Sequence, residues 1–423
     1  MAYSKVVIVG GGFAGLNTAK ALKKANFDVL IIDKTNHHLF QPLLYQVATA
    51  ALSPGDIATP IREILSKQEN ATVIMGEVVS IDKTLKQLTL ANGDIIGYDY
   101  LVIAPGARHS YFGNDQWEKN APGLKTISDA LKIREQVLVS FEKAERMDSI
   151  AEAAKFLNFV VIGGGPTGVE MAGAIAEIAH HTLFKNFRRI KPEKSRIFLI
   201  EAAPHILPTY PEKLSIRAKH DLEELGVTVL VSTKVTDVTI EGVQTEGLFI
   251  EARNVIWAAG NQASPLLKSL DVPLDRPGRV IVGPDLSIPG HPDVFVLGDA
   301  AHTPGKDGKP LPGVATVAIQ QARYVAKNIL HAIPQEQRKP FVYFDKGSMA
   351  TIGRSKAVVA IGSIRFSGLL AWLAWCFVHI VYLIGFRNRL SVMTEWFYHF
   401  FTGERGVRLI YRTLDPELKK KNH

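Results

Sequence analysis

Residues 5–15 read KVVIVGGGFAG, a run of mostly β-branched residues that leads directly into a glycine-rich turn. A helical pattern follows through Leu22. Gly10, Gly12 and Gly15 therefore lie where a strand ends and a helix opens. A glycine motif alone is weak evidence, because tight turns are rich in glycine. In this context, however, backbone N–H groups and the helix dipole can meet a pyrophosphate, which predicts a dinucleotide-binding α/β unit.

The same pattern recurs at residues 159–170, which read FVVIGGGPTGVE. A further strand-like run reaches Gly106, 96 positions after Gly10, and its counterpart reaches Gly260, 97 positions after Gly163. This matched spacing predicts two units of one architecture. Each unit also contains a segment of short strands, expected at residues 72–82, 87–90 and 227–240.

An acidic residue ends the next strand of each unit. Asp33 follows residues 29–32, and Glu201 follows residues 196–200 at a longer interval, which the stretch 180–194 explains as an insertion or helix extension. Either carboxylate is placed to accept from ribose hydroxyls, although acidic residues are also ordinary in turns. Glu201 would repel a 2′-phosphate and no Arg stands beside it, so the second nucleotide is expected to be NADH rather than NADPH.

A third strand, residues 293–297, ends in Gly298 and Asp299 and is followed by a glycine- and proline-rich loop and a helix from about Val314. We expect the chain to return here to the first unit. Hydride transfer needs donor and acceptor atoms roughly 3 to 3.5 Å apart, so two dinucleotide sites on one chain suggest that one ring is a flavin. Asp299 would accept from the ribityl chain, and the helix N-terminus would stabilise the reduced flavin. A plain Asx turn is the alternative for Asp299.

The composition narrows the chemistry. A chain of 423 residues exceeds what one core usually serves, so two or three domains are expected. Its only cysteine, Cys376, cannot form an internal disulfide, a CxxC pair or a thiolate metal site. Redox chemistry must therefore belong to a bound cofactor, and no metal is required.

The positive charge is concentrated at the end of the chain. The formal net charge is +8, and from Arg354 onward there are 11 Lys or Arg against 4 Asp or Glu. These charges flank residues 366–386, an apolar run without formal charge that is long enough to span a membrane. Interspersed Gly, His and aromatic residues favour a segment that lies on the membrane instead, with a buried core helix as the alternative. Residues 391–401 offer a second apolar surface.

Basic residues beside this run suggest anionic lipid rather than nucleic acid as partner, at ~1 kcal/mol each: Arg387, Arg389, Arg405, Arg408 and Arg412. No secretory signal is visible before Lys5, so we expect a peripheral protein on the cytoplasmic face of the inner membrane.

Several stretches resemble the type II NADH dehydrogenases, single-chain NADH:quinone oxidoreductases of the two-dinucleotide flavoprotein superfamily. They are GGGPTGVE at 163–170, HLFQPLLYQVA at 38–48, LIGFRNR at 383–389 and RGVRLI at 405–410. The resemblance runs nearly end to end. It implies two Rossmann-like domains of the glutathione-reductase-like α/β fold plus a C-terminal membrane-associating helical module. It also implies FAD, NADH, a membrane quinone and no proton pumping.

The resemblance carries some roles over to single residues. Glu170 matches an acidic residue that faces the nicotinamide and quinone region, and its alternative is a first-turn carboxylate that pairs with the helix dipole. Gln320 and Gln321 match glutamines near the flavin ring and quinone headgroup, and a solvated polar helix face is their alternative. Thr316 stands where many relatives carry a glutamine, so it joins the expected quinone set.

The expected sites and domains follow. The catalytic residues are Glu170 and Gln320. The FAD set is Gly10, Gly12, Phe13, Ala14, Gly15, Asp33, Lys34, Val79, Ala104, Gly106, Gly298, Asp299 and Ala315. The NADH set is Gly163, Gly165, Pro166, Thr167, Gly168, Glu170, Glu201, Ala259 and Gly260. The quinone set is Thr316, Gln320 and Gln321. The FAD domain is expected at 1–118 and 290–345, the NADH domain at 119–289 and the membrane-anchoring module at 346–423. A C-terminal homodimer contact is plausible.

Two rival functions remain. One is an NADH-dependent reductase of a soluble iron–sulfur protein, which the apolar C-terminal segment disfavours. The other is a flavoprotein that senses NADH without turnover. Disulfide reductases, peroxide-reducing oxidases and sulfide:quinone reductases of this fold use active-site cysteines, which Cys376 cannot supply.

Overall fold

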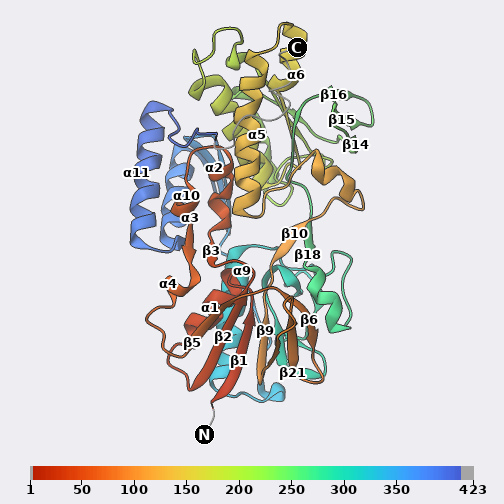
Figure 1. Cartoon of the computed structure of the whole chain (residues 1–423), viewed down its shortest axis with the longest axis vertical. Coiled ribbons are helices and arrows are strands. Elements are labelled where there is room, and N and C mark those ends of the chain that lie inside the picture. Colours follow the sequence, from red (N-terminus) through yellow and green to blue (C-terminus); the bar gives the residue numbers. More distant parts are fainter. Residues whose placement is uncertain (1–2, 411–423) are drawn as a thin grey trace. The chain divides into compact units, whose positions relative to one another are not determined.

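The computed structural model describes residues 3–410, in two compact units (Figure 1). The first comprises Met1–Leu39, Ala58–Ser110 and Asn261–Lys346. The second comprises Phe40–Ile57, Tyr111–Gly260 and Gly347–His423. The domain boundaries expected from the sequence cut the chain elsewhere and stay a prediction.

A six-stranded sheet organises the first unit, in the order β20-β21-β9-β1-β2-β5. All neighbours are parallel except β20 and β21. The strands are β1 (Ser4–Val9), β2 (Phe27–Asp33), β5 (Ala71–Met75), β9 (Tyr100–Ile103), β20 (Ser287–Ile288) and β21 (His291–Val296). Val6, Val7 and Ile8 are fully buried, as expected for a parallel strand covered on both faces. Because β21 pairs with β9, the predicted return of the chain to the first unit is confirmed.

Two helices of this unit, α1 (Phe13–Ala21) and α9 (Ala315–Leu330), pack against each other. The first of them, α1, follows β1. A three-stranded sheet consists of β6 (Val78–Asp82), β7 (Gln87–Leu90) and β8 (Ile95–Gly97). Three pairs of short strands complete the unit: β3 (His37–Leu39) with β4 (Ala58–Pro60), β10 (Ala107–His109) with β18 (Asn261–Ala263), and β19 (Val280–Ile281) with β22 (Ala301–His302). The short helix α4 (Ile61–Ile64) follows β4. The predicted excursion into short strands is therefore present.

The second unit repeats the plan with a parallel sheet in the order β13-β12-β11-β17. Its strands are β11 (Asn158–Ile162), β12 (Arg196–Ile200), β13 (Val227–Leu230) and β17 (Asn254–Trp257). The helices are α5 (Ile127–Glu145), α6 (Ile150–Leu157), α7 (Pro166–Glu177) and α8 (Glu212–Glu224), and the excursion is β14 (Val235–Val238), β15 (Gly242–Thr245) and β16 (Phe249–Glu251). The expected insertion is a single π-helical turn at Ile178–Thr182 followed by a loop.

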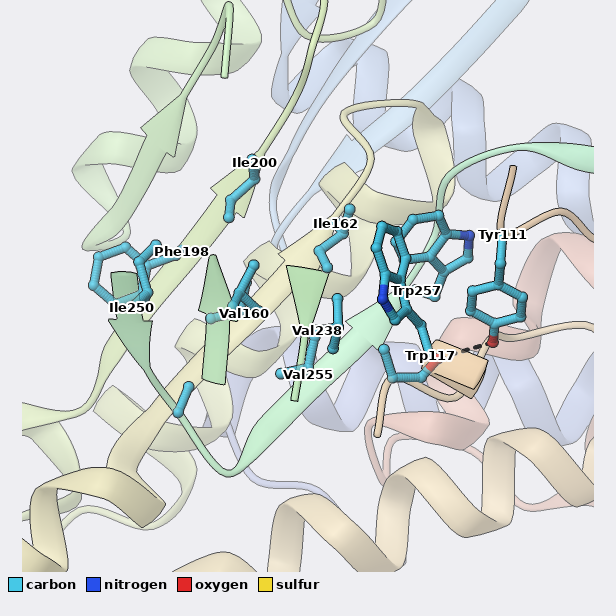
Figure 2. Close-up of a cluster of buried hydrophobic side chains, with 13 residues drawn as sticks. Tyr111, Trp117, Val160, Ile162, Phe198, Ile200, Val238, Ile250, Val255 and Trp257 are labelled. Carbon is cyan, nitrogen blue, oxygen red and sulfur yellow. Dashed lines mark hydrogen bonds between the residues drawn. The ribbon is translucent and has the colours of Figure 1, made fainter. Parts of the chain in front are cut away.

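One core joins the sheet of this unit to its excursion. Figure 2 shows Val160 and Val255 on the sheet next to Val238 and Ile250 from the excursion. Trp257 continues the cluster, with its ring centroid 5.0 Å from that of Tyr111. The second sheet is thus fixed by buried apolar contacts on this face.

The C-terminal part of the second unit begins with an antiparallel sheet that the sequence did not predict: β23 (Ser348–Ile352), β24 (Lys356–Ile361) and β25 (Ile364–Gly368). α10 (Leu369–Tyr382) and α11 (Phe386–Thr402) follow, and α2 (Leu44–Ala48) and α3 (Pro54–Ile57) belong to the same unit.

The apolar run 366–386 is not one helix. Its first three residues complete β25, and α10 ends at Tyr382, before Gly385 adopts a φ of +92°. Among residues 3–410, no helix combines the length and apolar character needed to cross a bilayer.

Candidate functional site

The first phosphate loop, residues 10–15, requires glycine for steric reasons. Gly10 has a φ of +100°, and a Cβ there would lie 2.2 Å from the Ala104 carbonyl oxygen. A Cβ on Gly15 would lie 1.8 Å from the Gly10 carbonyl oxygen. A Cβ on Gly12, in contrast, would meet nothing within 4 Å. The loop therefore closes tightly behind and leaves open space at the N-terminus of α1, as a pyrophosphate needs.

Asp33 braces this loop. Its Oδ2 accepts from the Gly11 N–H at 2.6 Å, and its Oδ1 accepts from Thr35 N–H at 2.7 Å and the Thr35 hydroxyl at 2.8 Å. The other residues expected at FAD lie in the same unit. Ala104 and Gly106, with φ +71°, follow β9, while Lys34 and Val79 are exposed.

Gln321 shapes the turn after β21. It is 1% exposed, its Oε1 accepts from the Gly298 N–H at 2.7 Å, and its Nε2 donates to the Thr303 hydroxyl at 3.0 Å. The alternative of a solvated helix face is therefore wrong for this residue. A Cβ on Gly313 would lie 2.9 Å from Asp299 Oδ1, so glycine is needed where the following loop passes that carboxylate.

The two other residues of α9 that were expected at the quinone are tied to the segment after this helix. Gln320 donates from Nε2 to the Phe344 carbonyl at 2.9 Å and accepts at Oε1 from the Phe344 N–H at 3.0 Å. The Thr316 hydroxyl lies 2.9 Å from the Tyr343 hydroxyl. These residues thus hold residues 343–344 against α9.

The second phosphate loop, residues 163–168, has the same backbone plan as the first. Gly163 has a φ of +110°, and a Cβ on Gly168 would again lie 1.8 Å from the carbonyl oxygen at the start of the loop. A Cβ on Gly165 would meet nothing within 4 Å, and Pro166 occupies the first position of α7. Ala259 and Gly260, with φ +70°, follow β17 as Gly106 follows β9.

Glu201 has the role that Asp33 has in the first unit. Its Oε2 accepts from the Gly164 N–H at 2.6 Å and its Oε1 from the Ala203 N–H at 2.7 Å. The insertion after α7 has lengthened the chain between loop and carboxylate without changing this contact.

Glu170 is buried inside the second unit. It is the fifth residue of α7, which has no acidic residue in its first turn, so the helix-dipole alternative is wrong. Glu170 is 9% exposed, and the Thr351 N–H lies 3.5 Å from its Oε1. Burial raises the pKa of Glu170 to about 8, so its neutral acid form dominates at pH 7.

A cavity of about 40 Å³ lies beside Glu170, entirely within the second unit. We call it the acidic cavity. Its walls come from α2, α7, the end of β23, α10, α11 and the segment after α11, and they include Tyr45, Glu170, Glu177, Trp375, Glu395, His399 and Arg405. Such a volume holds a few water molecules.

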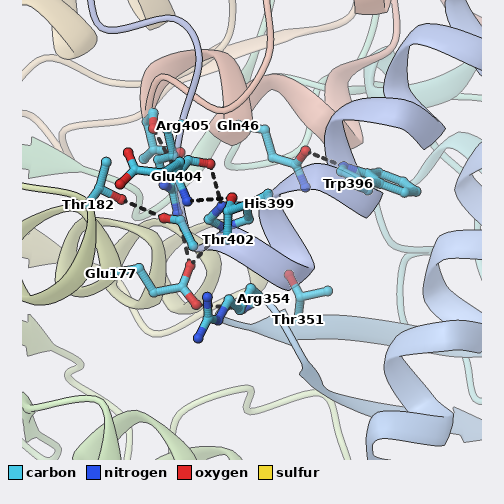
Figure 3. A network of polar contacts seen from close by, with 12 residues as sticks. Gln46, Glu177, Thr182, Thr351, Arg354, Trp396, His399, Thr402, Glu404 and Arg405 are labelled. Atoms are coloured by element: carbon cyan, nitrogen blue, oxygen red, sulfur yellow. Dashed lines mark hydrogen bonds and ion pairs between the residues drawn. The ribbon is translucent and has the colours of Figure 1, made fainter.

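One side of the acidic cavity is a fixed ionic network (Figure 3). Glu177 accepts from Arg405 at 2.9 Å and from the Arg354 N–H at 2.6 Å, and His399 Nε2 lies 3.6 Å away. Burial alone would raise the pKa of Glu177, but His399, Arg405 and the Arg354 N–H hold it below its usual range. Arg405 also donates to the Thr49 carbonyl at 2.6 Å.

This network corrects one prediction about lipid contacts. Arg405 is 4% exposed and bound to Glu177, so it does not face a lipid surface. Arg387 and Arg389 are exposed, as expected, while Arg408 is half-buried and Arg412 lies outside the described residues. Glu177 carries no sequence signal for this role, because its partners lie far away along the chain.

A second chain of contacts reaches the cavity from α11. Trp396 Nε1 donates to Gln46 Oε1 at 2.7 Å, Gln46 Nε2 donates to the Tyr45 hydroxyl at 2.9 Å, and that hydroxyl lies 2.9 Å from the Thr351 hydroxyl. Gln46 and Tyr45 belong to the HLFQPLLYQVA stretch at 38–48. The resemblance of that stretch to the type II NADH dehydrogenases was the one sequence signal that pointed to these two residues.

Cys376 is not a reactive thiolate. It lies on α10, and burial raises the pKa of its thiol to about 12. The thiol therefore stays protonated at neutral pH.

The fold and the paired phosphate loops define a class of protein. Residues 4–322 match the family model described as pyridine nucleotide-disulphide oxidoreductase, three quarters of the chain, and the chain belongs to that family. Residues 346–405 match the NDH2 C-terminal domain.

Relatives specify the branch. The chain is 48% identical to the type II NADH:quinone oxidoreductase NdhA of Mycobacterium tuberculosis, over 96% of this chain and 89% of that protein. It is 31% identical to the type II NADH:quinone oxidoreductase of Staphylococcus haemolyticus, over 84% and 89%. The chain therefore belongs to the type II NADH:quinone oxidoreductases.

A solved structure shares the fold. NDH2 from Plasmodium falciparum, in complex with NADH, superposes with a TM-score of 0.87 at 22% identity, covering 96% of this chain and 99% of that one. The predicted α/β fold class is thereby confirmed.

Proposed function

We propose that this chain oxidises NADH and reduces a membrane quinone, with FAD as the resident flavin and without proton pumping. The duplicated phosphate loops, each braced by a carboxylate, are the observation that supports two dinucleotides on one chain. Family membership supplies the activity class.

FAD is assigned to the first phosphate loop. The open space at Gly12 and the forced glycines at 10 and 15 fit a pyrophosphate against α1. Asp33 accepts from the ribose, and the region of Gly298, Asp299 and Ala315 faces the ribityl and ring end. When bound, the flavin supplies the chemistry of hydride acceptance from NADH and two-electron delivery to quinone. The remaining FAD residues are those expected from the sequence.

NADH is assigned to the second phosphate loop by the same argument. Gly165 leaves the room, Pro166 and Thr167 begin the helix, and Glu201 accepts from the ribose 2′-hydroxyl. The carboxylate of Glu201 disfavours a 2′-phosphate, so the coenzyme is NADH.

Reduction of a quinone by NADH consumes one proton from solution, because the hydride carries only one of the two hydrogen nuclei that the quinol gains. Glu170 is the proposed donor of that proton, since it is buried and neutral at pH 7. Thr316, Gln320 and Gln321 are proposed for the quinone region. Gln321 acts there by holding the Gly298 turn.

The C-terminal helices are proposed to lie on an anionic membrane. α10 and α11 expose large apolar side chains, among them Leu370, Phe377, Phe386, Phe397 and Phe401, next to exposed Arg387 and Arg389. We assign the protein to the cytoplasmic face, as a peripheral protein. Replacing Phe377, Phe397 and Phe401 together by Ser should release it from anionic vesicles. Retention would contradict this assignment. The C-terminal homodimer remains a hypothesis that light scattering can test. The domain boundaries given above remain a hypothesis that limited proteolysis can test.

The decisive experiment compares electron acceptors. NADH oxidation by the purified protein should be supported by a quinone in lipid vesicles far better than by a soluble iron–sulfur protein. The reverse preference would favour the rival reductase. Reduction by NADH with no turnover on any acceptor would favour the sensor.

A further inference from the structure

Two buried donors in the wall of the acidic cavity have no acceptor among residues 3–410. They are Trp375 Nε1, on a side chain 1% exposed, and Arg405 Nε, on a side chain 4% exposed. Buried N–H groups are almost always hydrogen-bonded, to water where protein supplies no partner. A cavity of about 40 Å³ with two free donors and several carboxyl groups is polar and large enough for ordered water.

Two carboxyl groups line this cavity and, unlike Glu177, form no salt bridge within residues 3–410. Glu170 contributes from α7, and Glu395 contributes from α11, where it is half-buried. Glu170 is almost wholly buried, whereas Glu395 lines the cavity and is also partly exposed at the protein surface.

We propose that Glu395 relays protons from solution to Glu170 through water held in the acidic cavity. The inference rests on the proposed function, since it supplies the one proton that quinone reduction consumes. Trp375 Nε1 and Arg405 Nε hold the water, and Glu395 is the positioning and relay residue.

The proton balance is simple. The O–H bond of the Glu170 acid breaks as its proton moves to a quinone oxygen, while the electrons arrive from NADH. The Glu170 carboxylate then takes a proton from the cavity water, the water takes one from the Glu395 acid, and Glu395 takes one from bulk solution. No oxidation state changes in the relay.

The other ionisable groups around the cavity are already committed. Glu177 is locked by Arg405, His399 and the Arg354 N–H and stays charged. His399 Nδ1 lies 3.0 Å from the Glu404 carbonyl, and the Tyr45 hydroxyl is shared with Thr351 and Gln46. The charged or titratable groups that face Glu170 and the cavity are Tyr45, Glu177, Tyr210, Arg354, Glu395, His399 and Arg405. Burial and the charge of Asp56 raise the pKa of Glu395, which favours a carboxyl that can carry a proton.

The test uses the full-length flavoprotein and separates the two half-reactions. NADH-reduced protein is mixed with quinone, and flavin reoxidation and proton uptake are followed together, the latter with an indicator dye. We expect Glu395→Gln to slow both at least about tenfold and to enlarge the solvent deuterium isotope effect. Flavin reduction by NADH should keep its wild-type rate. Glu395→Asp, which keeps a carboxyl, should restore much of the lost rate, and Trp375→Phe should slow proton uptake.

Glu404→Gln is the matched control, since it makes the same change nine residues further along, outside the cavity wall. Wild-type proton uptake and isotope effect in Glu395→Gln would overturn the relay. So would slowing of equal size in Glu404→Gln. A wild-type protein that NADH does not reduce at all would instead contradict the proposed function.

Discussion

The two phosphate loops of this molecule are nearly identical in backbone, yet the residue two positions after each loop differs. A Cβ on Gly15 or on Gly168 would lie 1.8 Å from the carbonyl oxygen of the first glycine of its loop. Asp33 and Glu201 each accept a hydrogen bond from a loop N–H at 2.6 Å. At the matched position the first helix has Asn17, which donates to the Phe13 carbonyl at 2.7 Å, and the second has Glu170, buried beside the acidic cavity. The loop geometry is duplicated, but the ionisable group is not.

This difference separates the structural requirements of nucleotide binding from those of proton transfer. Nucleotide binding depends on local backbone geometry that one turn can provide, so it can be copied. The proposed proton transfer depends on the burial of Glu170 and on the cavity residues that α2, α10 and α11 contribute.

The largest effect is expected from adding a methyl group to each loop. Gly15→Ala should leave protein with little bound flavin, and Gly168→Ala should retain flavin but lose reduction by NADH. Each forces a Cβ against a backbone oxygen, which should weaken nucleotide binding by about 3 kcal/mol, roughly a hundredfold. Flavin content and the rate of bleaching by NADH measure the two effects. Gly247→Ala, where a Cβ meets nothing within 4 Å, is the control. Loss of bound flavin in Gly168→Ala would contradict the assignment of the two loops to separate nucleotides.

The next effect concerns the unduplicated carboxyl. The folded-state pKa of Glu170 is about 8, above its ordinary value of 4.5, so the unfolded chain loses this proton at lower pH than the folded one. The wild type should therefore lose stability as pH rises from 5 to 8, relative to Glu170→Gln, by about 3 kcal/mol. Urea unfolding of both proteins at the two pH values measures this. Glu152→Gln, which removes a carboxyl at an exposed residue, is the control. If the difference in the free energy of unfolding between Glu170→Gln and wild type is the same at both pH values, Glu170 is not a buried acid with a raised pKa.

A smaller effect tests the twin carboxylates. Glu201→Gln should narrow the preference for NADH over NADPH about fivefold, since a neutral amide no longer repels a 2′-phosphate and forms weaker hydrogen bonds. The ratio of kcat/KM for the two coenzymes reports this. Asp33→Asn, the same change in the first unit, should leave that ratio unchanged while weakening FAD retention. An altered coenzyme ratio in Asp33→Asn would argue against separate sites.

The smallest effect lies at the first helical position. Pro166 begins α7 where Phe13 begins α1. Pro166→Ala should lower the free energy of unfolding by about 0.5 kcal/mol, because the unfolded chain gains freedom, and should weaken NADH binding by no more than about twofold, since Pro166 serves the NADH site only by starting the helix. Denaturant titration and NADH binding distinguish these outcomes. A large loss of NADH affinity would assign Pro166 a direct role.

The sequence predicted the features that short segments specify. Strand, glycine turn and helix are contiguous, and Asp33 and Glu201 each end a β-branched run, so local pattern was enough. The network of Glu177, Arg354, His399 and Arg405 was missed because its partners are separated by up to 228 positions. Arg405 was assigned to lipid for the same reason, since a basic residue in a basic segment gives no sign of a buried partner. The sheet β23–β25 was not predicted, because the apolar run at 366–386 gave a stronger helical signal and overlaps the end of β25.

The visible spectrum of the purified protein under anaerobic NADH titration tests the central claim most directly. We expect flavin absorbance at one FAD per chain, loss of that absorbance with one equivalent of NADH, and full recovery when a quinone is added. A protein without flavin, or one whose flavin NADH does not reduce, would contradict it.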